Sequence, residues 1–427
     1  MSNLLKIENL YSDGTETEID RLNQNGQYSL AYHKCELILI EWADGIEWFN
    51  DNKWYRDEEL DDKLNDKLND KLDEMKLKSK NKGKGKLIEG KKKPSLRLMD
   101  LFSVAAYYTN NFYRSYHIQQ KLLNSSYTNV TANMDRIKSN IHFSIEKIKD
   151  RLNFFPQDIV QKLNNPDREK RGLVTLTMTT CKRFDLFERT FNSFLNACRD
   201  IELIDRFLII DDNSSEEDRH TMEHMYPFIE LVRKKEEDRG HPISMNMIKN
   251  MVETPYCLHL EDDHEFFCHR NYIKPSMRIM LENDDIRQVL FNENYGEIPS
   301  DLPNIGGGEI MKTKSGKKFR VHVHYPMGTP EYDQYMASLG KPSNTHWPHF
   351  SFRPSLFRTD IWHRIGDYQM EREFERGYAN RYTANGFRSA FLIGLHHIHI
   401  GRTSHDLKEG KNVENAYILN NTRQWGY

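Results

Sequence analysis

The part of the chain between residues 172 and 263 alternates short apolar runs with amphipathic segments, and this alternation limits the fold more than any other feature. Four of the runs have the length and the apolar, β-branched composition of buried strands. They are Leu173–Thr180, Phe207–Ile210, 228–234 and Cys257–Leu260. The segments between them carry apolar residues at helical spacing, as in the phenylalanine-rich run 184–198. This order predicts an α/β fold with a mostly parallel sheet and right-handed crossovers.

Polar residues follow three of these runs, where the carboxyl ends of parallel strands meet and α/β proteins bind ligands. They are Thr179, Thr180 and Arg183 at the end of the first run, Asp211 and Asp212 after the second, and Glu261, Asp262 and Asp263 after the fourth. Three adjacent carboxylates repel one another unless a cation or a polyhydroxyl ligand lies near. Alternation along a strand predicts that Glu261 and Asp263 share one face and that Asp262 points to the other. A dinucleotide fingerprint and a P-loop are excluded, because neither glycine motif occurs.

Composition narrows the class of protein further. The 61 Lys and Arg residues nearly balance the 64 Asp and Glu residues, so the charge does not indicate a nucleic-acid partner. The five cysteines lack metal-ligand spacing and are typical of buried thiols in a reducing compartment. We see no signal peptide at the N-terminus and no apolar run of about 18 residues, the length that spans a membrane. These features predict a cytoplasmic protein without a transmembrane segment.

The chain divides into four parts by composition. Residues 1–57 hold strand-like and aromatic runs and predict a small β-containing module. Residues 58–94 combine a DKLN repeat, whose leucines recur every four residues, with a lysine- and glycine-rich stretch that predicts a flexible linker. The leucine stripe fits either a homo-oligomer formed through the N-terminal region or a single solvated helix. Residues 95–170 predict a helical connector, and residues 171–427 form the α/β domain.

The C-terminal part contains further candidate site residues. A hairpin is expected around Ser315–Gly316, and a helix is expected from Met370 to Asn385–Gly386. That helix carries three acids, of which helical spacing places Glu371 and Glu375 on one face and Glu373 on another. A last strand ends in a histidine cluster and a basic residue, and alternation places two of the histidines on one face. The residues of this strand end are His396, His397, His399 and Arg402.

An aromatic stretch lies between the hairpin and that helix. Trp347 and His349 belong to it, and they fit equally well a wall that stacks on a sugar ring and a packed core.

The chain resembles a glycosyltransferase of the GT-A fold, similar to the family 2 type. Thr180–Arg183 resembles that family's T-x-x-R turn, and Asp211–Ser214 resembles its D-D-x-S nucleotide motif. Asn246 stands where the family has an R-N donor contact, although the arginine is missing. Glu261–Asp263 stands in place of the D-x-D motif, in the E-D-D form of N-acetylglucosaminyltransferases. The resemblance covers roughly residues 172–405.

The resemblance implies a Rossmann-like catalytic domain and a role for each matching residue. Asp263 and His399 would hold Mn²⁺ or Mg²⁺, and Glu375 or Glu373 would be the general base. On the donor side, Asp211 or Asp212 would accept a hydrogen bond from uracil, with Thr179 and Arg183 lining the same pocket. Glu261 or Asp262 would bind ribose, and Arg402 a diphosphate oxygen. Trp347 and His349 would lie on the acceptor side.

The implied activity is that of a metal-dependent glycosyltransferase (EC 2.4). It would move a sugar from a nucleotide-sugar, a UDP-sugar by the uracil assignment, to a hydroxyl of a glycan, protein or small-molecule acceptor, with inversion. Two alternatives stay open. One is a nucleotidyltransferase acting on a sugar phosphate, which needs a glycine-rich loop that Thr179–Arg183 does not provide. The other is a non-catalytic carbohydrate-binding protein on the same fold.

Overall fold

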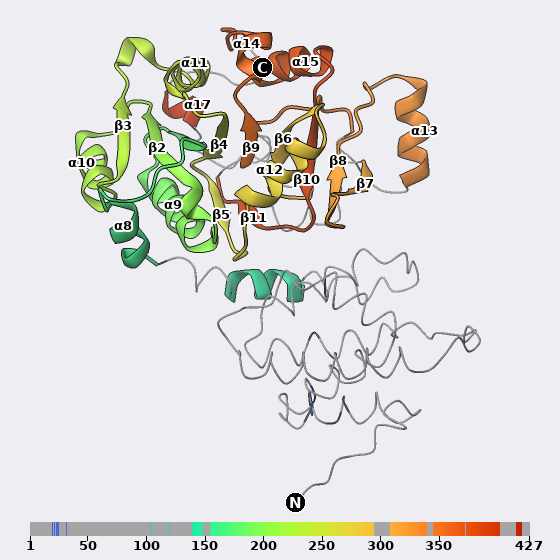
Figure 1. Ribbon diagram of the computed structural model, residues 1–427, viewed down its shortest axis with the longest axis horizontal. Coiled ribbons are helices and arrows are strands. Elements are labelled where there is room, and N and C mark those ends of the chain that lie inside the picture. Colours follow the sequence, from blue (N-terminus) through green and yellow to red (C-terminus); the bar gives the residue numbers. More distant parts are fainter. Residues whose placement is uncertain are drawn as a thin grey trace, which may run out of the picture. The chain divides into compact units, whose positions relative to one another are not determined.

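A computed structural model of the chain describes residues 154–293, 308–339, 345–371, 373–401 and 416–420, the helical residues 139–147, and isolated residues nearer the N-terminus (Figure 1). The chain forms two compact units, Met1–Ile148 and Lys149–Tyr427. The expected module 1–57, apart from isolated residues, and the whole of the expected segment 58–94 lie outside the described residues. Within the expected connector, helix α8 (Gln157–Leu163) belongs to the second unit.

The second unit is built on a nine-stranded sheet with the strand order β3-β2-β1-β4-β9-β6-β10-β8-β7, counted over the described residues. Its first four strands are β1 (Val174–Thr180), β2 (Ile204–Asp211), β3 (Ile229–Arg233) and β4 (Tyr256–Glu261). Strand β1 lies between β2 and β4, and all of these pairs are parallel. The α/β fold and the parallel arrangement predicted for these strands are confirmed.

The other half of the sheet is mixed. Strand β9 (Ser355–Arg358) runs antiparallel between β4 and β6 (Ile286–Leu290), and β10 (Arg388–Leu392) is parallel to β6. The expected hairpin is confirmed as β7 (Glu309–Lys312) and β8 (Lys318–Val321). Its turn contains Gly316 with a φ of +83°, a conformation that favours glycine. A separate small sheet pairs β5 (His264–Phe266) with β11 (His397–His399).

Helices cover both faces of the sheet (Figure 1). Besides α8, the described helices of this unit are α9 (Phe184–Ala197), α10 (Glu216–Met225), α11 (His241–Met251), α12 (Ile273–Glu282), α13 (Pro330–Leu339), α14 (Ile361–Ile365), α15 (Phe374–Ala384) and the short α17 (Ala416–Leu419), with 3₁₀ turns at Ile201–Leu203 and Glu236–Asp238. Strand β2 packs against a helix on each of its faces. Phe207 packs edge-on against Phe191 of α9, and Leu208 and Ile210 share a core with Ile248 of α11. Burial on both faces explains its continuous apolar sequence.

Three local predictions are wrong. The predicted helix does not include Glu371 or Glu373, because the Glu373 backbone is not helical and α15 begins at Phe374. The predicted histidine-bearing strand is broken into β10 and β11, with Gly394 between them at a φ of +104°. Asp262 and Asp263 do not alternate along a strand, because β4 ends at Glu261 and the two aspartates form a turn before β5.

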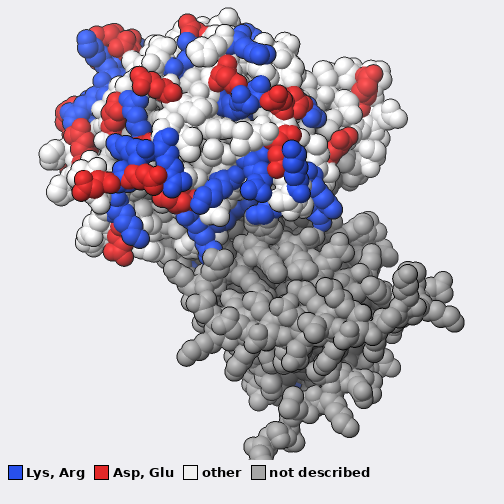
Figure 2. Space-filling view, viewed as in Figure 1, with Lys and Arg blue, Asp and Glu red and all other residues white. Residues whose placement is uncertain are grey.

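Surface charge on the second unit follows the balanced composition. Lys and Arg side chains are interspersed with Asp and Glu side chains over the face seen in Figure 2. Among the residues that the structure describes, no helix is both long enough and apolar enough to cross a membrane.

Candidate active site

The predicted site residues meet at one edge of the sheet. Because β1, β2 and β4 are parallel and adjacent, their carboxyl ends lie side by side. In this register Thr180 stands opposite Asp211, and Thr179 stands opposite Glu261. The turn after β1 adds Arg183, and the turn after β4 adds Asp262 and Asp263. The chain therefore brings three separate polar clusters of the sequence to one place.

Arg183 joins the two aspartates of the acid triplet. Its Nη1 lies 3.1 Å from Asp263 Oδ2, and its Nη2 donates to Asp262 Oδ1. Asp262 Oδ2 also accepts a hydrogen bond of 2.9 Å from the Thr180 hydroxyl. The guanidinium thus bridges both carboxylates and fixes the turn after β4 to the start of α9.

The two neighbouring aspartates differ in acidity. Burial raises the pKa of Asp262 to about 6, although Arg183 opposes the shift. Burial also acts to raise the pKa of Asp263, but His399 and Arg183 together hold it well below its usual range. Asp263 is therefore an anion at neutral pH, which a metal ligand needs to be.

Asp263 forms a cluster with two histidines from the small sheet. Strand pairing sets His264 of β5 opposite His399 of β11. His399 Nε2 lies 3.4 Å from Asp263 Oδ2, and His264 Nε2 lies 4.0 Å from Asp263 Oδ1. One ligand atom from each of the three residues lies within 4.8 Å of the others. Asp263 and His399, which were predicted together, thus lie in one cluster with His264, a residue that sequence reasoning did not assign.

The surroundings of this cluster fit a divalent cation. One carboxylate and two imidazoles form a donor set that transition metals accept. The Ile400 N–H donates to the Asp263 carbonyl at 2.8 Å, and a Cβ on Gly401 would lie 2.3 Å from Asp263 Oδ2. The backbone after β11 therefore approaches the carboxylate as closely as only glycine allows. His397 Nδ1, 3.1 Å from His264 Nδ1, holds the ring of His264 from behind.

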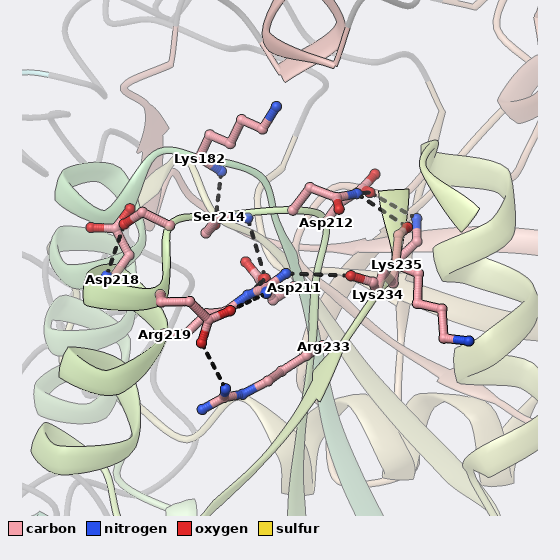
Figure 3. Close-up of polar contacts among 12 residues, drawn as sticks. Lys182, Asp211, Asp212, Ser214, Asp218, Arg219, Arg233, Lys234 and Lys235 are labelled. Atoms are coloured by element: carbon pink, nitrogen blue, oxygen red, sulfur yellow. Dashed lines mark hydrogen bonds and ion pairs between the residues drawn. The ribbon is translucent and has the colours of Figure 1, made fainter. Parts of the chain in front are cut away.

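Asp211 and Asp212 are both engaged by protein donors (Figure 3). Asp211 Oδ2 accepts from Arg219 Nε at 2.6 Å and from the Ser214 N–H at 3.3 Å. Asp212 Oδ1 lies 3.1 Å from Lys234 Nζ, and its Oδ2 accepts from the Gly240 N–H at 2.9 Å. Lys234 also donates to the Gly240 carbonyl at 2.9 Å. These contacts clasp the end of β2 to the turn that starts α11.

Two further residues, Asn246 and Arg402, were predicted for the donor side. Asn246 of α11 is bonded at both ends of its amide to the backbone of Tyr368, at 2.8 and 2.9 Å, which ties α11 to the loop before α15. Arg402 lies outside the described residues.

Glu375 is the partly buried acid near this edge. Its Oε1 accepts hydrogen bonds of 3.0 Å from the Ser351 hydroxyl and from the Phe352 N–H. Burial and, after it, the charge of Glu261 raise the pKa of Glu375 to about 7. Glu373, in contrast, is exposed and lies 3.3 Å from Arg376. A carboxyl with a pKa near 7 is suited to accept a proton at neutral pH.

The two residues predicted for the acceptor side are packed differently. Trp347 is half-buried, donates from Nε1 to the Phe350 carbonyl at 2.8 Å, and carries the Arg376 guanidinium 5.4 Å from its ring centroid. His349 is buried, and burial lowers its pKa to about 2, with His322 adding to the effect. His349 is thus a neutral core residue, whereas Trp347 is only partly buried.

Comparison with known proteins gives matches among solved structures only. No family model and no curated protein matches the chain. A mannosyltransferase, PcManGT from Pyrobaculum calidifontis in complex with GDP-Man and Mn²⁺, matches at 13% identity over 63% of this chain and 69% of its own, with a TM-score of 0.37. GalNAc-T7 with UDP, GalNAc and Mn²⁺ matches at 13% identity over 61% of this chain, with a TM-score of 0.36. The chain spans about half (52%) of the GalNAc-T7 structure.

Two residues besides His264, namely Tyr417 and His241, lie at this edge although sequence reasoning did not assign them. Tyr417 of α17 has its hydroxyl 3.4 Å from His241 Nδ1, at the start of α11. The His241 ring also contacts Phe352 and Phe374, with centroids 5.3 and 5.1 Å away. His264 had a signal, since it directly follows the acids; Tyr417 had none, because a short apolar run far along the chain is no sign of a site.

Together these residues offer three chemical capabilities. The Asp263–His264–His399 cluster can hold a divalent cation. Arg183 supplies a permanent positive charge beside it. Glu375 can accept a proton at neutral pH. A reaction that combines a departing anion with an attacking hydroxyl can use all three.

Proposed function

We propose that this protein is a metal-dependent glycosyltransferase of the GT-A fold. It transfers a sugar from a nucleotide-sugar, a UDP-sugar, to an acceptor hydroxyl with inversion. The observation that carries the proposal is the Asp263–His264–His399 cluster at the carboxyl edge of the parallel strands, with Arg183 and Glu375 beside it. The order of the T-x-x-R, D-D-x-S and E-D-D motifs along β1, β2 and β4 supports the same conclusion.

The metal site is assigned to Asp263, His264 and His399. Two imidazoles in the donor set favour Mn²⁺ over Mg²⁺, which prefers oxygen ligands. When bound, the cation neutralises charge on the departing diphosphate. Arg183, held by two carboxylates, keeps the turn that carries Asp263 in place beside the proposed metal site.

Glu375 is assigned as the general base. Ser351 and Phe352 both donate to its Oε1, which fixes the carboxyl group and leaves Oε2 to take the proton of the acceptor hydroxyl. Its raised pKa brings it close to the acidity at which a base works best in neutral solution. Inversion by in-line attack, with one base activating the acceptor hydroxyl, is proposed from the resemblance to family 2 and not from the position of any one residue.

The remaining donor contacts are assigned by exposure. Glu261, with 30% of its side chain exposed, is the acid of the triplet best able to bind ribose hydroxyls. Asp262 is buried and bonded to Thr180 and Arg183. A uracil contact by Asp211 or Asp212 would require an exchange with Arg219 or Lys234, or a bond to a free lone pair.

Binding measurements on the intact chain test this function. We expect isothermal titration calorimetry to detect Mn²⁺ binding, and UDP binding that strengthens when Mn²⁺ is present. His399→Ala should weaken Mn²⁺ binding by about tenfold or more. His363→Ala is the matched control, because His363 is exposed on α14 and should leave both affinities unchanged. Equal Mn²⁺ affinity in the wild type and His399→Ala, or no nucleotide binding by UDP, GDP or CMP, would contradict the proposal.

A further inference from the structure

A short segment near the C-terminus, residues 416–420, packs on the turn that follows β1. The Cys181 thiol donates to the Ala416 carbonyl at 3.7 Å, and Lys182 Nζ donates to the Leu419 carbonyl at 3.1 Å. That turn is itself fixed, because the Lys182 N–H donates to the Ser214 hydroxyl at 2.9 Å (Figure 3). The segment therefore rests on the same turn that carries Arg183 into the candidate site.

Tyr417 reaches from this segment toward the reacting groups. Burial raises its pKa, and the charges of Glu375 and Glu261 add to the effect, which means that both acids lie near the phenol. Its hydroxyl lies 3.4 Å from His241 Nδ1. Tyr417 is thus in the neighbourhood of the assigned base, the assigned ribose acid and the start of α11.

His241 is held in place with one ring nitrogen uncommitted. The peptide group before it is clamped, because Asp212 accepts from the Gly240 N–H and Lys234 donates to the Gly240 carbonyl. His241 Nδ1 faces the Tyr417 hydroxyl, and the buried His241 Nε2 has no hydrogen-bond partner among the described residues. Burial lowers the pKa of His241 to about 4, so the ring is neutral and carries one proton. When Tyr417 donates to Nδ1, that proton sits on Nε2 and is available to an oxygen acceptor.

We propose that Tyr417 and His241 form an additional wall of the donor site, in which Tyr417 positions His241 so that its Nε2 donates to an oxygen of the nucleoside diphosphate. This inference rests on the proposed function. Tyr417 acts through His241 and is a positioning residue. Because residues 416–420 lie on both the β1 turn and His241, nucleotide binding and docking of this segment stabilise each other.

The inference is tested by nucleotide affinity in three variants of the intact chain. Tyr417→Phe removes only the hydroxyl that faces His241, and we expect it to weaken UDP binding by about fivefold to tenfold, the effect of one lost hydrogen bond. Tyr417→Ala should weaken UDP binding at least as much. Mn²⁺ affinity should stay unchanged in both, since neither variant touches the Asp263–His264–His399 cluster. Tyr332→Ala on α13 is the matched control and should leave UDP affinity unchanged.

A second readout follows the segment itself. Cys181 is 5% exposed and lies beneath Ala416, so its alkylation rate reports how often residues 416–420 undock. We expect UDP to slow Cys181 alkylation in the wild type and to have less effect in Tyr417→Ala.

The outcomes distinguish a failure of the inference about Tyr417 from a failure of the proposed function. If the wild type binds UDP and both Tyr417 variants bind it equally well, with only the thermal midpoint lowered, Tyr417 is a structural anchor and the inference is overturned. If the wild type binds no nucleotide at all, the proposed function fails, and the inference fails with it.

Discussion

Neighbouring residues at this site differ through their contacts rather than their type. Asp262 and Asp263 are adjacent aspartates, both buried, and both bonded to Arg183. The pKa of Asp262 is nevertheless raised and that of Asp263 lowered, because His399 and His264 face only the second. Sequence reasoning singled out Asp263 as the candidate metal ligand from its place in the triplet, and the two histidines make its carboxyl the more acidic of the two.

Glu375 allows a prediction about pH. Its pKa of about 7 lies above the ordinary 4.5, so between these values the folded chain holds a proton that the unfolded chain releases. The free energy of unfolding contributed by this group therefore falls as the pH rises through that window. Glu375→Gln removes the effect, so the stability of the variant relative to the wild type should increase from about pH 5 to about pH 8. Urea unfolding of both proteins at the two pH values measures this difference in the free energy of unfolding. The same difference at both pH values would mean that the pKa of Glu375 is not raised.

At the scale of elements, the clasp between β2, β3 and α11 depends on a buried ion pair. Lys234 lies against Asp212 (Figure 3). The Lys234 side chain is fully buried, whereas that of the next residue, Lys235, is largely exposed. Lys234→Met should lower the free energy of unfolding by about 3–5 kcal/mol, because it leaves a buried carboxylate uncompensated. Combining it with Asp212→Asn should recover part of this loss. Lys235→Met should change stability by less than about 0.5 kcal/mol; an equal effect at both lysines would refute the clasp.

Gly401 and Gly377 differ in what an added Cβ atom would meet, and this difference gives a further prediction. A Cβ on Gly401 would meet Asp263 atoms at 2.3–2.7 Å, and Asp263 is held on its other side by Arg183. Gly401→Ala should therefore cost about 1–3 kcal/mol of stability and weaken Mn²⁺ binding. A Cβ on Gly377 in α15 would meet only the end of the flexible Glu371 side chain, so Gly377→Ala should be neutral or stabilising by about 0.5–1 kcal/mol. Urea unfolding and calorimetry compare the two; a Gly401→Ala variant that keeps full Mn²⁺ affinity would contradict the close approach.

Elements were predictable where their signal is local. Strands β1 to β4 and helix α9 follow from apolar runs whose period can be read within a few residues. Strand β9 could not be placed, because its position between β4 and β6 depends on pairing with strands far away in the chain. The start of α15 was missed because acids at residues 371 and 373 suit a first helical turn as well as the loop before it.

At the scale of the whole molecule, the assigned site lies within one compact unit. The described residues to which we assign roles, from Arg183 to Tyr417, belong to the unit Lys149–Tyr427. A fragment of residues 149–427 should therefore fold with a single thermal transition and bind Mn²⁺ and UDP as tightly as the full chain. Calorimetry on both proteins checks this. A folded fragment that has lost nucleotide binding would show that residues 1–148 contribute to the site.

Assembly at this scale explains why the site was only partly predictable. The sequence places polar residues at three strand ends, with acids at two of them, and parallel pairing brings these ends together without further information. Tyr417, His241 and the partners of Asp211 and Asp212 come from segments whose proximity depends on the complete fold. Nothing in the sequence indicates that Arg219 pairs with Asp211 or that Lys234 pairs with Asp212.

The central claim is that the cluster around Asp263 supports transfer of a sugar from a nucleotide donor. The most direct test incubates the chain with a panel of nucleotide-sugars and Mn²⁺ and measures release of the free nucleotide. We expect release from one donor class, a UDP-sugar, and a loss of at least about a hundredfold in Asp263→Ala, while that variant stays folded. No release from any donor, or equal release by the wild type and Asp263→Ala, would contradict the claim.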